Sequence, residues 1–162
     1  PCVNAYRELM VSMCLQRYSW YAARAYSLKM DNASVTRVAD GDPVARMVAE
    51  RRQARAVYWL EQRHAGAEYS QWAALASEEE RVAARAQVRR IVDDLKREGV
   101  VHGDIHGSNL CVDSSGTVSL LDFGWCMWRA FKLSGPERDL LEKRLAEDFD
   151  WKHFDRCTSA QT

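Results

Sequence analysis

Much of the chain alternates apolar and polar residues at the spacing of amphipathic helices. Residues 4–29 contain no glycine or proline, and their apolar positions roughly follow a helical spacing, which predicts a helix. The stretch ELMVSMCL within them is also compatible with a buried strand. A turn-rich connection follows, and Asp42 before Pro43 marks a helix start because a capping acid precedes a proline in the first turn. That helix is expected to run to about His64.

A further helix is predicted from Ser70 or Ser77 to about Glu98. Ser77 and Glu80 have the spacing of a capping box, and Gly99 is suited to end the helix. The expected inner edge of this helix consists of Val82, Ala86, Arg89, Val92 and Leu95.

After Gly99 the helical spacing gives way to short apolar runs. Val100–Val101 and Leu110–Val112 are predicted strands, and residues 113–116 (DSSG) are a predicted hairpin turn. Residues 117–121 form the expected return strand. The polar residues that separate these runs therefore lie in loops held by strands.

A second capping box, at Ser134 and Glu137, predicts a last helix that runs to about Phe154. The chain then divides into a helical region, residues 1–98, and a region with short strands, residues 99–162. The expected fold class is α+β, mostly α.

Charge and hydrophobicity argue against several kinds of partner, and the cysteine content indicates the compartment. Lys and Arg number 23 and Asp and Glu number 23, so the balanced charge predicts neither nucleic acid nor an anionic membrane as a partner. No run approaches the roughly twenty apolar residues that span a bilayer. The five cysteines include no C-x-x-C pair, which predicts free thiols and a reducing, cytoplasmic location.

Three polar residues lie between and after the predicted strands. Asn109 comes five residues after Asp104, and Asp122 comes thirteen residues after Asn109, at the end of the return strand. Phosphoryl transfer requires one carboxylate to orient a hydroxyl, together with amide and carboxylate oxygens that hold magnesium. These three residues supply that set.

The segment HGDIHGSNLCVDSSGTVSLLDFG resembles the catalytic and metal-binding loops of the protein-kinase-like superfamily, including the hairpin between them. The resemblance covers about residues 85–125. It implies that Asp104 is the catalytic base and that Asn109 and Asp122 are ligands of Mg²⁺ (or Mn²⁺). It also implies ATP as the nucleotide and a protein-kinase-like C-terminal lobe whose short hairpins carry the site.

The same resemblance gives expectations for the neighbouring residues. Phe123 and Gly124 would complete the metal loop, and His102 would be the packed histidine that supports the catalytic loop. His106 would either contact a phosphate or the acceptor, or merely pack.

Two departures narrow the class. Conventional protein kinases carry arginine where this chain has Gly103, and usually lysine where it has His106. The H-G-D-x-H-x-x-N form resembles the aminoglycoside and choline phosphotransferase branch and various atypical or viral kinase-like proteins. We therefore expect transfer of the ATP γ-phosphoryl group to a hydroxyl acceptor, with a small molecule favoured slightly over a protein serine or threonine.

The residues upstream do not match a complete kinase. No glycine occurs before Gly41, so a glycine-rich phosphate loop is missing from that stretch. Lys29 and Glu50 are candidates for the phosphate-binding lysine–glutamate pair, although the residues before Lys29 have helical spacing. We expect an N-terminal lobe that is reduced or absent, with residues 1–98 either beginning the C-terminal lobe or replacing the N-terminal one. A partner chain or a dimer would then complete the site.

Two other functions fit parts of the sequence. A pseudokinase or scaffold lobe would bind a partner or a nucleotide without turnover. A calcineurin-like metallophosphoesterase would use His102, Asp104 and His106 as metal ligands. That family also needs a second G-D motif and a later G-N-H segment, and neither follows Asn109.

Overall fold

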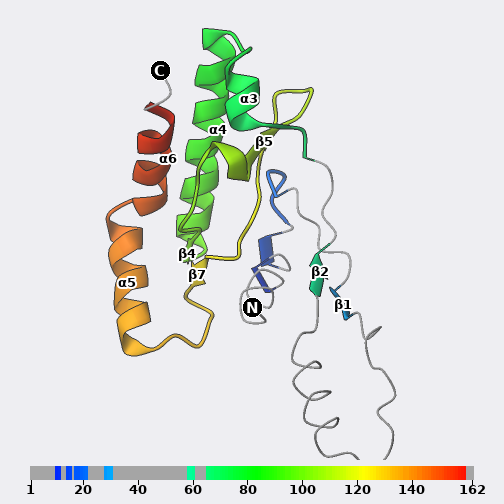
Figure 1. The fold of residues 1–162 in the computed structure, drawn as a ribbon. Coiled ribbons are helices and arrows are strands. Elements are labelled where there is room, and N and C mark those ends of the chain that lie inside the picture. Colours follow the sequence, from blue (N-terminus) through cyan, green and yellow to red (C-terminus); the bar gives the residue numbers. More distant parts are fainter. Residues whose placement is uncertain are drawn as a thin grey trace, which may run out of the picture.

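The computed structural model describes residues 10–11, 14–15, 17–21, 28–30, 58–60 and 65–159 (Figure 1). Its elements in chain order are β1 (Leu28–Met30), β2 (Tyr58–Leu60), β3 (Ala67–Glu68), α3 (Tyr69–Ala73), α4 (Glu78–Arg97), β4 (Val100–Val101), the 3₁₀ turn η1 (Gly107–Asn109), β5 (Leu110–Val112), β6 (Val118–Leu120), β7 (Met127–Trp128), α5 (Gly135–Ala146) and α6 (Phe149–Ser159). The fold class is α+β, as predicted, with helices joined by very short strands.

The strands form three small antiparallel sheets. β1 pairs with β2, β4 pairs with β7, and β5 lies between β3 and β6. The β5–β6 hairpin was predicted from the sequence, and its register sets Leu110 opposite Leu120 and Val112 opposite Val118. The turn closes with a hydrogen bond from the Gly116 amide to the Asp113 carbonyl.

Helix α4 is the scaffold on which the hairpin and α6 pack. It begins with the predicted capping box, in which Ser77 and Glu80 each accept a hydrogen bond from the other's backbone amide. It lies between β6 on one side and α6 on the other (Figure 1). Its buried residues are Ala84, Val88, Ile91, Val92 and Leu95.

The inner face of α4 therefore differs from the predicted edge in the first half of the helix. Val92 and Leu95 are buried as expected, but Val82 and Ala86 are exposed. Ala84 and Val88 take their place and face the hairpin. Small apolar residues lie on more than one side of this alanine-rich helix, so the buried side is set by packing against β6 and α6 rather than by spacing alone.

The core has two parts. The larger part joins the α4 face to the inward side chains of β5 and β6, to Phe123 and Phe154, and to Trp20 and Tyr21 from the N-terminal region. Tyr21 forms an isolated parallel bridge with Leu120, which brings that region against the hairpin. A smaller part lies under β4 and α5 and contains Val101, Leu133, Leu141 and Leu145.

Three helix predictions need correction. The helix predicted over residues 4–29 gives way to turns at residues 17–20, and Leu28–Met30 is strand β1. The helix predicted from Pro43 to His64 does not include Tyr58–Leu60, which is strand β2. Both strands satisfy each other's backbone groups in an antiparallel pair, so pairing between distant segments outweighs the local helical spacing.

The last predicted helix is divided in two. α5 ends at Ala146 and α6 begins at Phe149, and Asp148 between them has a left-handed backbone with φ of 57°. The Asp148 carboxylate forms an ion pair with Arg89 of α4. This contact ties the break to α4 and lets α6 lie along it.

Candidate functional site

The loop between β4 and η1 carries the predicted catalytic residues. Val101 ends the buried strand β4, and His102, Gly103 and Asp104 follow it directly. Gly103 has φ of 87°, a conformation that a residue with a side chain rarely adopts, and a Cβ there would approach the Trp125 carbonyl at 3.3 Å. The glycine therefore lets the chain turn tightly so that Asp104 faces outward.

His102 is fully buried, and both of its ring nitrogens are engaged. Nε2 lies 2.9 Å from the Leu121 carbonyl oxygen, and Nδ1 accepts a hydrogen bond of 3.3 Å from the Asp104 amide. Its ring meets the Phe123 ring edge-on, with centroids 4.7 Å apart. Burial lowers the pKa of His102, and the two contacts fit a neutral ring with its proton on Nε2. His102 thus ties the catalytic loop to the strand end that precedes Asp122.

Asp150 holds the same loop from α6, and the sequence analysis missed it. Its Oδ2 accepts a hydrogen bond of 2.8 Å from the His102 amide, and its Oδ1 accepts one of 2.9 Å from the Gly103 amide. The side chain is 5% exposed, and burial raises its pKa against the opposing effects of His102 and the two amides. The available signal was an acidic residue within the aromatic-rich segment FDWKHF, residues 149–154.

Asn109 lies next to Asp104 at the end of η1. Its Nδ2 donates to the Asp104 carbonyl at 2.9 Å and lies 3.4 Å from Asp104 Oδ2. His106 Nε2 lies 3.5 Å from the same Oδ2, while His106 Nδ1 accepts from the Ser108 amide. The Asp104 carboxyl is partly open to solvent, so it can reach a bound hydroxyl.

Asp122 lies at the same end of the hairpin as Asn109. The Leu121 amide donates to the Asn109 carbonyl at 2.9 Å, so β6 ends beside the point where β5 begins. Asp122 has φ of 58°, its side chain is exposed, and its Oδ1 accepts from the Gly124 amide at 3.1 Å. Phe123 turns the other way into the core, against His102 and Tyr21.

The donor set fits a hard cation such as magnesium. Asp122 offers an exposed carboxylate, and the Asn109 amide nitrogen is turned to Asp104, which leaves its oxygen for a ligand. Among the described residues, no group of three or more His, Cys, Asp or Glu side chains is arranged to hold a metal ion. A metal here would therefore take its remaining ligands from water and from phosphate oxygens.

The phosphoesterase alternative is not supported by this geometry. It requires His102 as a metal ligand, but the His102 ring is buried and each ring nitrogen already faces a backbone partner.

Glu68 is a second residue that the sequence analysis missed. It lies at the end of β3 and accepts hydrogen bonds from Ser70 and, at 2.9 Å, from Ser108 of η1. The two hydroxyl groups lower the pKa of Glu68, so the carboxylate is ionised beside the catalytic loop. Its position depends on the pairing of β3 with β5, which no local pattern indicates.

The predicted lysine–glutamate pair is only partly within the described structure. Lys29 lies in the middle of β1, opposite Trp59 of β2, rather than at the end of a helix. Glu50 lies outside the described residues, so the pairing stays a prediction.

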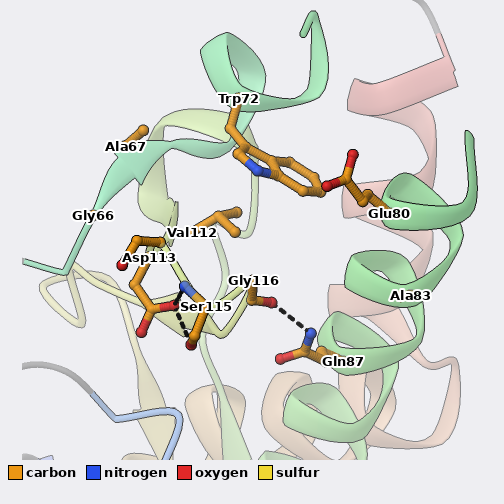
Figure 2. A pocket seen from close by; sticks show the side chains of 11 residues that line it. Gly66, Ala67, Trp72, Glu80, Ala83, Gln87, Val112, Asp113, Ser115 and Gly116 are labelled. Carbon is orange, nitrogen blue, oxygen red and sulfur yellow. Dashed lines mark hydrogen bonds between the residues drawn. The ribbon is translucent and has the colours of Figure 1, made fainter. Parts of the chain in front are cut away.

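A cavity of about 990 Å³ opens at the far end of the hairpin (Figure 2). Trp72 and Glu80 lie on one side of it and the turn at residues 113–116 lies on the other. Gln87 crosses from α4, donating to the Gly116 carbonyl and accepting from the Val118 amide. None of the predicted catalytic residues lines this cavity, so it is separate from the candidate site.

Comparison with known proteins gives the class of this chain. A model of the phosphotransferase enzyme family (APH) matches residues 36–130, and the chain belongs to that family. The match begins well upstream of the residues 85–125 that carry the sequence resemblance and includes the catalytic loop and the metal loop. The kinase-like superfamily was therefore predicted correctly.

One solved structure similar to this chain is that of the bifunctional kinase-methyltransferase WbdD. It is 16% identical with a TM-score of 0.44, over 89% of this chain and 27% of that chain. The chain thus spans about a quarter of the length of that protein. No curated protein sequence matches significantly. In the part of the chain that the structure describes, no helix is both long and apolar enough to cross a membrane.

Proposed function

We propose that the chain is the catalytic part of an ATP- and magnesium-dependent phosphotransferase whose acceptor is a hydroxyl group of a small molecule. The observation that carries the proposal is the arrangement around one hairpin end, where Asn109 bonds to Asp104 and lies beside the strand end that leads to Asp122. Membership of the phosphotransferase family supports the same chemistry.

In this proposal Asp104 acts on the acceptor. Its carboxylate accepts the hydroxyl proton while the acceptor oxygen forms a bond to the γ-phosphorus and the bond from that phosphorus to the ADP oxygen breaks. Asn109 keeps the carboxylate from turning away and directs its own amide oxygen outward. A magnesium ion held by Asn109 and Asp122 would neutralise charge on the phosphates.

The acceptor class is inferred from the loop itself. Gly103 replaces the arginine that reads a phosphorylated activation loop in conventional protein kinases, so such regulation is not expected here. Only the segment 125–133 separates the metal loop from the capping box of α5, which leaves little chain to dock a peptide. A small hydroxyl compound fits better than a protein side chain.

Calorimetry of ATP binding with and without magnesium tests the metal site. Asp122→Asn is the sharpest variant because asparagine tolerates the left-handed backbone at this position and keeps an oxygen for the Gly124 amide. We expect magnesium-dependent binding in the wild type, weakened at least about tenfold in Asp122→Asn by the loss of a charged metal ligand. Asp139→Asn, an exposed acid on α5, is the matched control and should bind like the wild type.

Transfer is tested on a panel of hydroxyl compounds with ATP. Asp104→Asn should lower kcat by about 100-fold or more while ATP binding persists, since a positioned general base contributes about 10²–10⁴. Magnesium-dependent binding without turnover on any acceptor would instead favour the scaffold function. If the wild type does not bind ATP at all, a partner chain or a dimer would have to complete the site.

A further inference from the structure

Helix α6 presents two polar side chains to the catalytic loop. Asp150 and His153 are three residues apart and therefore lie on the same face of the helix. Asp150 binds the backbone of the loop, as described above. His153 reaches one residue further, to the side chain of the proposed base, with Nε2 3.7 Å from Asp104 Oδ1.

The Asp104 carboxylate consequently lies between two imidazole rings. His106 Nε2 is 3.5 Å from Oδ2, and His153 Nε2 is 3.7 Å from Oδ1. Asn109 also approaches Oδ2 but not Oδ1. These imidazole distances exceed those of a full hydrogen bond, but contacts of this kind tighten when a substrate binds. Among the described residues, His153 is thus the side chain that faces Asp104 Oδ1.

The His153 ring is held in place by its own helix. It stacks on the Phe149 ring with centroids 5.9 Å apart and an angle of 12° between the planes. Cys157 Sγ, on the next turn, lies 3.8 Å from His153 Nε2. The His153 side chain is 27% exposed. The Arg144 guanidinium packs on the other ring of the stack, 4.4 Å from the Phe149 centroid. A ring fixed in this way can hold a neighbour in one orientation.

We propose that His153 is a positioning residue that fixes the rotation of the Asp104 carboxylate. The last torsion of an aspartate is broad, so a carboxylate held at only one oxygen can swing. A general base must bring one oxygen within about 2.6–3.2 Å of the hydroxyl, and misplacement by about 1 Å can cost about 100-fold in rate. With Asn109 and His106 at Oδ2 and His153 at Oδ1, both sides are restrained. This inference rests on the proposed phosphotransfer.

Two substitutions separate positioning from packing. His153→Gln loses the ring stack but keeps an N–H donor that can reach Asp104. His153→Phe keeps the stack on Phe149 but has no donor. If His153 positions Asp104, the glutamine variant retains activity and the phenylalanine variant loses it; if the ring only packs, the order is reversed.

The readout is ATP turnover with magnesium and water as the acceptor, measured as released phosphate. We expect His153→Phe to lower kcat by about tenfold with KM for ATP unchanged, and His153→Gln to stay within about threefold of the wild type. Lys152→Ala, an exposed neighbour on the same helix, is the control and should match the wild type. Equal activity in both His153 variants, or greater loss in His153→Gln, overturns the proposal.

A measurement without turnover keeps the two proposals apart. The ¹⁵N resonances of the His153 imidazole should move in Asp104→Asn and stay in place in Lys152→Ala, because only the first change alters the group that the ring faces. Resonances that do not respond to Asp104→Asn overturn the contact. A wild type whose His153 resonances respond in this way, but which transfers phosphate neither to water nor to any hydroxyl compound of the panel, overturns the proposed function, and with it the role of His153 in positioning the base.

Discussion

Replacing Asp150 by asparagine tests how the catalytic loop is held. The carboxylate is 5% exposed and accepts one backbone hydrogen bond at each oxygen, from His102 and from Gly103. Asparagine has nearly the same size but only one acceptor oxygen. One of the two buried amides would therefore lose its acceptor and face an NH₂ group instead.

The expected loss follows from these two contacts. A hydrogen bond to a charged group contributes about 1.5–3 kcal/mol, and a buried donor left without an acceptor costs about 1–3 kcal/mol. Removing the charge also relieves the desolvation that raises the pKa of Asp150, which offsets part of the loss. We expect the free energy of unfolding to fall by about 2 kcal/mol, or roughly 4–8 °C in Tm for a domain of this size.

Urea unfolding of the 162-residue chain measures this loss, with Asp155→Asn as the matched control. Asp155 lies on the same helix and forms an ion pair with Arg85, but both side chains are more than a third exposed, so its loss should cost only about 0–1 kcal/mol. Amide hydrogen exchange adds a local readout, because the His102 and Gly103 amides should exchange faster only in Asp150→Asn. Equal losses in the two variants, with unchanged exchange at both amides, would refute the reasoning.

Two further predictions concern stability. Burial lowers the pKa of His102, so below its ordinary value near 6.5 the unfolded chain binds a proton that the folded chain does not. Urea unfolding should therefore show stability falling from pH 6.5 to 5.5, by up to about 1 kcal/mol, and constant or rising stability would contradict this. Gly66→Ala should lower the free energy of unfolding by about 2–3 kcal/mol, because its Cβ would lie 2.2 Å from the Val112 carbonyl oxygen. In the control Gly116→Ala the Cβ meets open space, so only the positive φ should cost about 1 kcal/mol. Equal losses of the two variants in urea would show that the β3–β5 approach is not as tight as described.

Local signals in the sequence were sufficient for the parts of the fold that local contacts determine. The capping boxes at Ser77 and Ser134 were predicted and are present, because each joins residues only three positions apart. The β5–β6 hairpin was predicted for the same reason, since its turn closes within four residues.

The errors arose where distant contacts decide. Asp148 breaks the predicted last helix without a glycine or proline, and its ion pair joins it to Arg89, fifty-nine residues away. Strands β1 and β2 have only three residues each and pair across a long separation, so the helical spacing around them was misleading. Burial of one particular stripe of α4 was likewise set by the elements that pack on it.

The same division holds within the candidate site. Asp104, Asn109 and Asp122 could be proposed from the sequence because they lie at short intervals, in the loop before the β5–β6 hairpin, at its start and at its end. Asp150 and His153, which hold the loop, lie nearly fifty residues away and belong to no interval that a motif records. They are brought to the loop because Phe154 on the same helix is fully buried in the core with α4 and the hairpin. Burial of Phe154 thereby orients the face of α6 that carries both polar residues, so a substitution that shifts Phe154 should also disturb the loop around Asp104.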